Sequence, residues 1–375
     1  MLRRLLGGLS PEQFLARHWQ KKPLLVRQAL PGFAGVMPKR ELLDLALRDD
    51  VESRLVECRD GRWSVRHGPL SRRDLGRKPH PWTVLVQGAN LHSDEADRLL
   101  RRFGFLPWAR LDDLMISYAV DGGGVGPHFD SYDVFLIQAS GRRRWRIGAQ
   151  RDLGLVPGAP LKILERFTPS EEWILEPGDL LYLPPRYAHD GVALGECVTC
   201  SVGFRAPAAQ ELARTFLAFL EEQIDLKGMY RDPDLARPRH PGRIGEDMVA
   251  QVEKMLAGIR WNRADVRAFL GGYLSEPKPQ VFFEPPEAPL SRSRFLRAWA
   301  RGGLELDRRT QMLFAGRRFF LNGEPVEAPA ADRARLTELA DRRRLATPQG
   351  LSEAGVDLIY EWYRCGFALP GEPNA

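Results

Sequence analysis

Three patterns in the sequence predict an α+β protein built around a double-sheet jelly roll, or cupin-like barrel. Many short apolar strands separated by turn residues run through residues 1–207, and candidate metal ligands lie on two strands that are far apart in the chain. After residue 207 the apolar residues take helical spacing, and the last part combines helices with a hairpin, which is typical of a winged helix. We therefore expect three domains, over 1–207, 208–280 and 281–375.

The composition indicates a globular protein and argues against membrane and disulfide-rich classes. Of the 375 residues, 43% are hydrophobic and 28% are charged, which is ample for a buried core. The net charge is +6, but 47 arginines and 8 lysines are spread along the whole chain, so we attribute it to genomic base composition. Four scattered cysteines, the lack of a long apolar run and the lack of a signal-peptide pattern predict a cytoplasmic location without membrane association.

The N-terminal part begins with a helix whose start is marked by three residues. Ser10 is the expected N-cap, Pro11 suits the first turn, and Gln13 completes a capping box. The elements expected after it are a strand at 24–26, a helix at 41–47, two strands within 51–65 around an Asp60-Gly61 turn, a strand from Trp82, a helix over 90–103 and a strand over 111–120.

The chain is organised around residues 122–147. Here His128 and Asp130 are two residues apart, so in an extended strand both side chains leave the same face. A third candidate, His189, follows a short strand and two prolines far downstream. Two histidines and one carboxylate form the ligand set of a facial-triad iron site, which leaves half of the coordination sphere open. Zinc accepts the same ligands, but an inward-facing arginine nearby favours iron with an anionic co-substrate.

That arginine is Arg143. We expect residues 130–138 and 142–147 to form a hairpin around the turn 139–141, and in its second strand Arg143 shares a face with the apolar Trp145. A buried guanidinium needs an anionic partner. Beside an iron site, the carboxylate of a bound ligand is favoured over an ion pair within the protein.

The first strand of this hairpin predicts further residues of a pocket. If His128 and Asp130 face inward and no bulge intervenes, the same face carries Tyr132, Val134, Leu136 and, as a polar contact, Gln138. The glycine-rich residues 122–126 lack the ending of a phosphate loop, so we expect a turn that approaches the metal closely. Cys197 and Cys200 lie in a predicted strand and are interpreted as buried free thiols.

Helices are expected in the rest of the chain. Residues 208–226 and 245–274 have helical spacing, and a connector at 231–242 rich in proline and charge separates them. Such short amphipathic helices need a surface to cover them, from the adjoining domain or from a partner subunit. After a proline-rich linker at 277–289, the last domain is expected to contain a helix at 292–300, a hairpin with an Asn322-Gly323 turn and helices at 332–343 and 352–365. Winged helices bind nucleic acid as often as protein, so we assign this one no ligand.

Several segments are together similar to the bacterial ribosomal oxygenases of the JmjC/cupin superfamily. They read PHFDSYDVFLIQASGRRRWRIG over 127–148, PGDLLYLPPRYAHDGVAL over 177–194 and SVGFRAP over 201–207, and the opening LSPEQFLARHWQKKPLLVRQAL fits the same family. The resemblance is specific over most of residues 1–207 and covers the rest in layout. It implies a jelly-roll domain, then a helical dimerisation domain, then a C-terminal winged-helix-like domain.

The resemblance also implies an Fe(II)- and 2-oxoglutarate-dependent hydroxylase that forms a homodimer. Bacterial members hydroxylate an arginine of large-subunit (50S) ribosomal protein number sixteen, and related eukaryotic members hydroxylate histidine in ribosomal proteins. Carried onto this chain, the resemblance makes His128, Asp130 and His189 the iron ligands. It pairs Arg143 with the distal carboxylate of 2-oxoglutarate and gives Ser117 a hydroxyl contact to the same co-substrate.

The substrate and even the activity stay open at this point. An arginine substrate needs acidic or aromatic groups around it, and Asp121, Asp133 and Tyr118 lie near the motif in sequence. One alternative is a non-catalytic cupin-type binding or ribosome-assembly module, which would bind RNA or ribosomes without the metal. Another is a hydroxylase that acts on histidine in a ribosomal protein. Contact with nucleic acid is open in every case.

Overall fold

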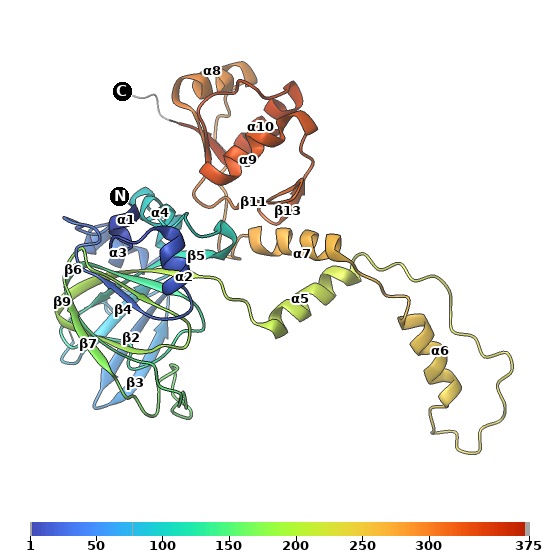
Figure 1. Ribbon diagram of the computed structural model, residues 1–375, viewed down its shortest axis with the longest axis horizontal. Coiled ribbons are helices and arrows are strands. Elements are labelled where there is room, and N and C mark those ends of the chain that lie inside the picture. Colours follow the sequence, from blue (N-terminus) through green and yellow to red (C-terminus); the bar gives the residue numbers. More distant parts are fainter. Residues whose placement is uncertain (1, 77, 372–375) are drawn as a thin grey trace.

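The computed structural model describes residues 2–76 and 78–371, and its centre is a curved antiparallel sheet of nine strands (Figure 1). Neighbouring strands follow the order β1-β8-β6-β9-β5-β4-β2-β3, and β7 pairs with β6. The predicted jelly roll is confirmed. Its strands are β1 (Leu24–Val26), β2 (Ser53–Arg59), β3 (Arg62–His67), β4 (Trp82–Val86), β5 (Leu111–Ala119), β6 (Val134–Gly148), β7 (Glu171–Leu175), β8 (Leu180–Leu183) and β9 (Ala188–Phe204).

The long strands β6 and β9 pair along almost their whole length and connect the two layers of the roll. The first half of β6 also pairs with β8, and its second half pairs with β7. Between the halves the register shifts on both sides of Ser140, and Gly141 has a φ of 62°. The predicted hairpin around 139–141 is therefore wrong. These turn-like residues form a bulge inside one strand, and the bend that a bulge produces lets β6 join both layers.

The predicted elements of the N-terminal part are present. The helix α2 (Pro11–Arg17) starts with the expected capping box between Ser10 and Gln13. β2 and β3 meet at Asp60 and Gly61, which both have positive φ as a tight hairpin turn requires. The other helical segments of this part are α1 (Leu2–Leu5), α3 (Lys39–Leu45), α4 (Asp94–Arg101) and the 3-10 turns η1 (Ala89–Leu91) and η2 (Trp108–Arg110).

An aromatic cluster fills the space between the N-terminal helices and the sheet. The ring of Phe135 lies 4.7 Å from that of Phe103 and 4.8 Å from that of Tyr182, and Phe14 of α2 lies 5.0 Å from Tyr182. Because side chains alternate along β6, Phe135 points into this core whereas Leu136 belongs to a separate apolar cluster. The face that carries Leu136 also carries the candidate site.

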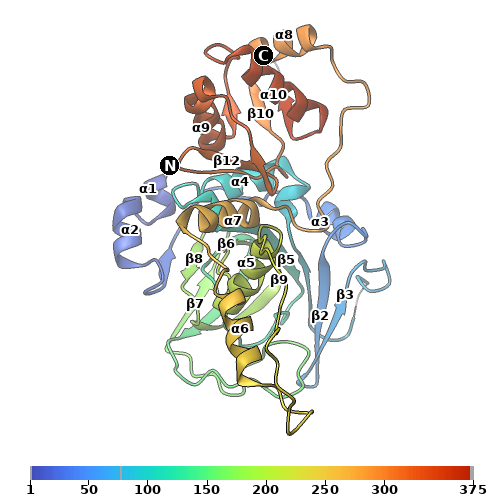
Figure 2. The same ribbon diagram turned by 90° about the vertical axis from the view of Figure 1, so that its right-hand side faces the viewer.

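Three helices follow the sheet domain: α5 (Ala209–Glu221), α6 (Glu246–Leu256) and α7 (Arg263–Ser275). The single helix expected over 245–274 is wrong, because Asn262 begins a new helix with its own capping box to Asp265. Figure 1 shows α6 projecting from the body of the molecule on extended connections, whereas in Figures 1 and 2 α7 lies against the last domain. None of the helices in the described ranges has the length and hydropathy needed to span a membrane.

The last domain has its own core around Phe295 and Trp299. Its predicted Asn322-Gly323 turn is present between two strands, with φ values of 53° and 93°. One three-stranded sheet has the order β14-β10-β15 and the other the order β11-β12-β13. Its elements are α8 (Arg292–Gly302), β10 (Leu304–Leu306), β11 (Met312–Ala315), β12 (Arg318–Leu321), β13 (Glu324–Val326), η3 (Ala330–Asp332), α9 (Arg333–Arg342), β14 (Arg344–Leu345), α10 (Glu353–Arg364) and β15 (Ala368–Pro370).

Candidate metal centre

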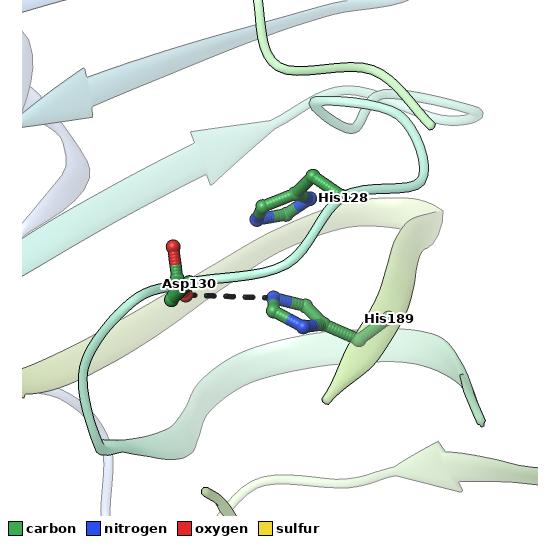
Figure 3. Close-up of side chains that lie close together, drawn as sticks. All are labelled: His128, Asp130 and His189. Carbon is green, nitrogen blue, oxygen red and sulfur yellow. Dashed lines mark ion pairs between the residues drawn. The ribbon is translucent and has the colours of Figure 1, made fainter. Parts of the chain in front are cut away.

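Three side chains from two separate parts of the chain converge on one point. The ligand atoms of His128, Asp130 and His189 all lie within 4.8 Å of one another (Figure 3). His189 is the second residue of β9, whereas His128 and Asp130 lie in the loop before β6 rather than in the expected strand. The backbone N–H groups of the two histidines each donate to the other's carbonyl, at 2.9 and 2.8 Å. This bridge holds the imidazoles side by side.

Backbone carbonyls orient both imidazole rings. The Nδ1 atom of His128 lies 2.8 Å from the Gly126 carbonyl oxygen, and the Nδ1 atom of His189 lies 2.9 Å from the Tyr187 carbonyl oxygen. An Nδ1–H group that donates to a carbonyl leaves the Nε2 lone pair free for a metal ion. The Nε2 atom of His189 lies 3.7 Å from a carboxylate oxygen of Asp130, so free donor atoms of both residues face the same space (Figure 3).

The electrostatics of the site suit a cation. Burial lowers the pKa of His189 to about 4, and His128 adds to this effect while Asp130 opposes it. The ring is therefore neutral at pH 7, as a metal ligand must be. Two imidazoles and one carboxylate, without further His, Cys, Asp or Glu in the same group of described residues, match the donor set of Fe(II) sites with open positions.

A cavity of about 550 Å³ opens beside these three residues. Its walls come from β2, β4, β5, β6 and β9, from the loops that carry residues 125–132 and 160–162, and from Lys278 of the distant linker. The predicted inward residues Tyr132, Val134 and Leu136 are among the wall residues, and so is Arg143. The site is thus a wide pocket that reaches from the three candidate ligands to the linker before the last domain.

Arg143 is buried on this wall, with 4% of its surface exposed. Its Nε atom lies 3.5 Å from the thiol of Cys197, and its guanidinium lies 5.8 Å from the ring of Trp145. Its Nη2 atom has no hydrogen-bond partner within residues 2–76 and 78–371. A buried cation that lines a cavity and has an unsatisfied donor is suited to a ligand carboxylate, because leaving such a group without a partner is costly.

The other two candidate co-substrate contacts have different surroundings. Ser117 lines the cavity, and its hydroxyl lies 3.5 Å from the Thr199 carbonyl oxygen, a long contact that leaves it free to bind a ligand. Gln138 is buried but is not a wall residue in the part of the chain that the structure describes. Its amide donates to the Ser140 carbonyl at 2.9 Å and accepts from the Thr199 hydroxyl at 3.1 Å. The bulge that follows Gln138 supplies this acceptor, because the register with β9 shifts between Gln138 and Ser140.

The residues suggested for the substrate pocket do not lie in it. Asp121 accepts a hydrogen bond from the Gly195 backbone at 2.7 Å, and Tyr118 lines a different cavity, next to Lys39. Asp133 is fully buried and accepts a hydrogen bond from the Tyr182 hydroxyl at 2.7 Å. These three interpretations were wrong because nearness in sequence does not fix the face of the sheet from which a side chain projects.

Besides the candidate ligand Asp130, the acidic residues that line the cavity are Asp112 and Asp113 near the start of β5 and Glu52 before β2. Asp113 could have been found from the sequence, because a strand with period two places it on the same face as Met115 and Ser117. Lys278, which lies beside the two aspartates, could not have been found. It is 165 residues away from Asp113 in the chain, in a segment without a regular pattern.

Comparisons with known proteins agree with this geometry. Residues 98–212 match the family profile described as "JmjC domain", and residues 258–368 match the one described as "ROXA-like winged helix". The chain is 36% identical over 326 residues to the ribosomal protein uL16 3-hydroxylase of Escherichia coli (strain K12), a match that covers 86% of both proteins.

Solved structures match over nearly the whole chain. The X-ray structure of E. coli ycfD has a TM-score of 0.84 and 33% identity and covers 96% of this chain and 98% of its own. A structure of YcfD, described as a ribosomal oxygenase from E. coli in complex with cobalt and 2-oxoglutarate, has the same identity and coverage with a TM-score of 0.81. The jelly roll, the three converging side chains and these matches together show that the chain belongs to the bacterial ribosomal oxygenases, a family of JmjC-domain proteins.

Proposed function

We propose that this protein hydroxylates an arginine side chain of the large-subunit ribosomal protein uL16, with Fe(II) as metal and 2-oxoglutarate as co-substrate. The proposal is carried by the convergence of two histidines and one aspartate in a cavity that also has Arg143 in its wall, whose buried Nη2 atom has no hydrogen-bond partner among the described residues. The names of the related proteins support it, since one is a uL16 3-hydroxylase and another binds cobalt and 2-oxoglutarate.

In this proposal, His128, Asp130 and His189 hold the iron. When bound, Fe(II) and 2-oxoglutarate supply with dioxygen the oxidation that places one oxygen on the substrate and converts 2-oxoglutarate to succinate and carbon dioxide. These three residues would hold the metal ion, and the cavity beside them has room for the co-substrate and the substrate. The carbonyls of Gly126 and Tyr187 hold the two imidazoles in the tautomer that binds metal.

Arg143 is assigned in this proposal to the distal carboxylate of 2-oxoglutarate. Its Nη2 atom gains the partner that it lacks within the described residues, and a charge-assisted bond of this kind is strong. Ser117 lies on β5, which β9 separates from the strand of Arg143, and donates a second hydrogen bond to the same end of the co-substrate. Gln138 acts only through Thr199, because the Thr199 hydroxyl donates to its amide oxygen.

The substrate arginine is expected to enter between Tyr132 and the start of β5. Asp113 lines the cavity and is buried, so a guanidinium that reaches it forms an ion pair with little competition from water. The apolar Met115 and the ring of Tyr132 also line the cavity and suit the methylene part of an arginine side chain. This chemistry favours arginine over the smaller histidine side chain.

The test is incubation of the protein with Fe(II), 2-oxoglutarate and uL16, followed by mass spectrometry of the digested product. We expect a gain of one oxygen on one arginine together with an equal amount of succinate, and neither with His189→Ala. A modified histidine would replace the arginine assignment. Binding of uL16 or ribosomes that survives His189→Ala, with no succinate from the iron-loaded wild type, would instead favour a non-catalytic assembly module.

A second proposal concerns α6, for which we infer that a second copy of this chain covers the apolar face. Met248, Val249 and Leu256 are 44%, 47% and 55% exposed, and together with Val252 and Met255 they form a stripe along one side of the helix. Because α6 stands away from the sheet domain, no other part of residues 2–76 and 78–371 covers this stripe (Figure 1). A helix with such an exposed stripe gains stability by packing against the same helix of a partner.

A further inference from the structure

Lys278 lines the cavity, although it lies outside the sheet domain. Its Nζ atom lies 3.1 Å from a carboxylate oxygen of Asp112 and 3.6 Å from one of Asp113. Asp112 also has Arg205 at 3.6 Å, whereas for Asp113 Lys278 is the one cation within 4 Å among the described residues. Backbone and amide N–H groups complete the surroundings of Asp113, from Gly88 at 2.9 Å and from Gln87 at 3.3 Å.

The charge state of Asp113 depends on Lys278 because Asp113 is buried, with 4% of its surface exposed. Burial raises the pKa of Asp113, and the Lys278 ammonium opposes that rise. Burial by itself would lower the pKa of Lys278, but Asp113 and Asp112 outweigh it and raise the pKa, so the lysine is charged. An ammonium close to a buried carboxylate therefore favours its ionised form, which is the form that binds a guanidinium as an ion pair.

The position of Lys278 is set by contacts of its segment with both the last domain and the sheet domain. The residue lies between Pro277 and Pro279, whose rings restrict the backbone, and three residues beyond the end of α7. The hydroxyl of Ser275, the last residue of α7, accepts a hydrogen bond at 3.1 Å from the N–H of Gly323 at the hairpin turn. On the other side, the Arg205 guanidinium donates to the Leu274 carbonyl at 2.8 Å. These contacts fix the linker between the two domains.

We propose that Lys278 is a positioning residue for substrate recognition. It keeps Asp113 ionised, so that this carboxylate can bind the substrate guanidinium, and contacts with the winged-helix domain place Lys278 in the pocket. This inference rests on the proposed function and names the residue that gives the pocket its preference for a cationic side chain. The winged-helix domain thereby serves to complete a substrate pocket in the neighbouring domain.

The experiment compares two uL16 peptides, one with the target arginine and one with citrulline in its place. Citrulline has nearly the same shape but no charge, so the ratio of the two kcat/KM values reports the charge of the pocket. For Lys278→Met we expect KM for the arginine peptide to rise about tenfold with little change in kcat, and the preference for arginine to fall by a similar factor. KM for 2-oxoglutarate should stay unchanged.

Three controls separate positioning from general damage. Lys278→Arg keeps the cation and should retain the wild-type preference, and Lys227→Met removes a lysine from an exposed ion pair with Asp225 without effect. If Lys278 acts through Asp113, the double variant Asp113→Asn with Lys278→Met should be no worse than Asp113→Asn alone. An unchanged preference in Lys278→Met, with a wild type that hydroxylates the arginine peptide, overturns the inference and leaves the function standing. A wild type inactive on that peptide overturns the proposed function itself.

Discussion

The single side chain on which the co-substrate assignment depends is Arg143. Its neighbour Arg142 lies on the same strand but is exposed on the opposite face, so the two arginines share a backbone and differ in surroundings. An arginine that lines a cavity, and whose buried Nη2 atom has no hydrogen-bond partner among the described residues, is stabilised when it gains a ligand carboxylate.

We therefore expect Arg143→Met to raise KM for 2-oxoglutarate about 30-fold, which corresponds to the loss of about 2 kcal/mol of a hydrogen bond between charged groups. Turnover of 2-oxoglutarate to succinate at increasing co-substrate concentration measures this change. Arg142→Met is the matched control and should leave KM within experimental error. Equal effects of the two substitutions would contradict the assignment.

His189 gives a prediction on stability in the metal-free protein. Its pKa in the folded state is about 4, below the ordinary value of 6.5, so as the pH falls the unfolded chain takes up the proton first. The contribution of His189 to the free energy of unfolding is complete above pH 6.5 and decreases as the pH falls towards 4, by up to about 3 kcal/mol.

Urea unfolding of the metal-free protein at pH 7 and pH 5 measures this decrease. We expect His189→Gln to lose less stability than the wild type between these two pH values. The exposed His67 provides the control, and His67→Gln should follow the wild type. A larger pH dependence in His189→Gln than in the wild type would reverse the sign argued here.

Among the elements of the fold, β6 belongs to both layers of the roll, so its backbone has to bend between them. Its bulge brings Gly141 into the left-handed region, and a Cβ atom at this position would overlap the Glu196 carbonyl oxygen of the neighbouring strand. Arg143 lies two residues further on, so the bulge also sets the place of the guanidinium in the cavity.

Gly141→Ala should accordingly lower the free energy of unfolding by more than about 3 kcal/mol, from positive-φ strain and from the clash. Gly195 is the matched control, since its φ of 77° is similar but a Cβ there meets nothing within 4 Å. Gly195→Ala should lower the free energy of unfolding only through backbone strain, by about 1–2 kcal/mol. Denaturant unfolding compares the two, and equal losses would show that the contact with Glu196 does not matter.

At the scale of the whole molecule, the apolar stripe on α6 predicts the oligomeric state. Val252→Asp places a charge in the stripe and should convert a dimer into a monomer of 42.5 kDa, because a buried unpaired carboxylate is unfavourable in an apolar interface. Gln251→Asp introduces the same charge next to the stripe and should leave the dimer intact. Light scattering after gel filtration measures both masses, and a monomeric wild type would contradict the proposed dimer.

The two folded units are also joined directly. The Trp108 indole donates to the Asp341 carbonyl at 3.1 Å, and the Arg308 guanidinium donates to the Leu91 carbonyl at 2.8 Å. With the contacts around Ser275 and Leu274, these bonds fix the winged-helix domain against the sheet domain. The linker that carries Lys278 is therefore held at both ends, which is the condition for one domain to supply a side chain to the pocket of the other.

Local patterns were sufficient for much of the fold. The cap at Ser10, the Asp60-Gly61 and Asn322-Gly323 turns and the alternation around Arg143 each depend on residues close together in the chain, and each is present in the structure. The same kind of pattern failed at 139–141, where turn residues form a bulge. The difference lies in the pairing of β6 with β9, which is a contact between distant residues.

The sequence by itself determined the class of the fold, the metal-binding residue types and the inward direction of Arg143, because periodicity and spacing act over a few residues. Only the tertiary structure decided which acidic groups face the cavity, that Gln138 supports the bulge and that Lys278 reaches Asp113. The physical reason is that a cavity is formed by strands and linkers that are distant in the chain. The packing of two domains, and not the spacing of residues, decides which of their side chains meet in it.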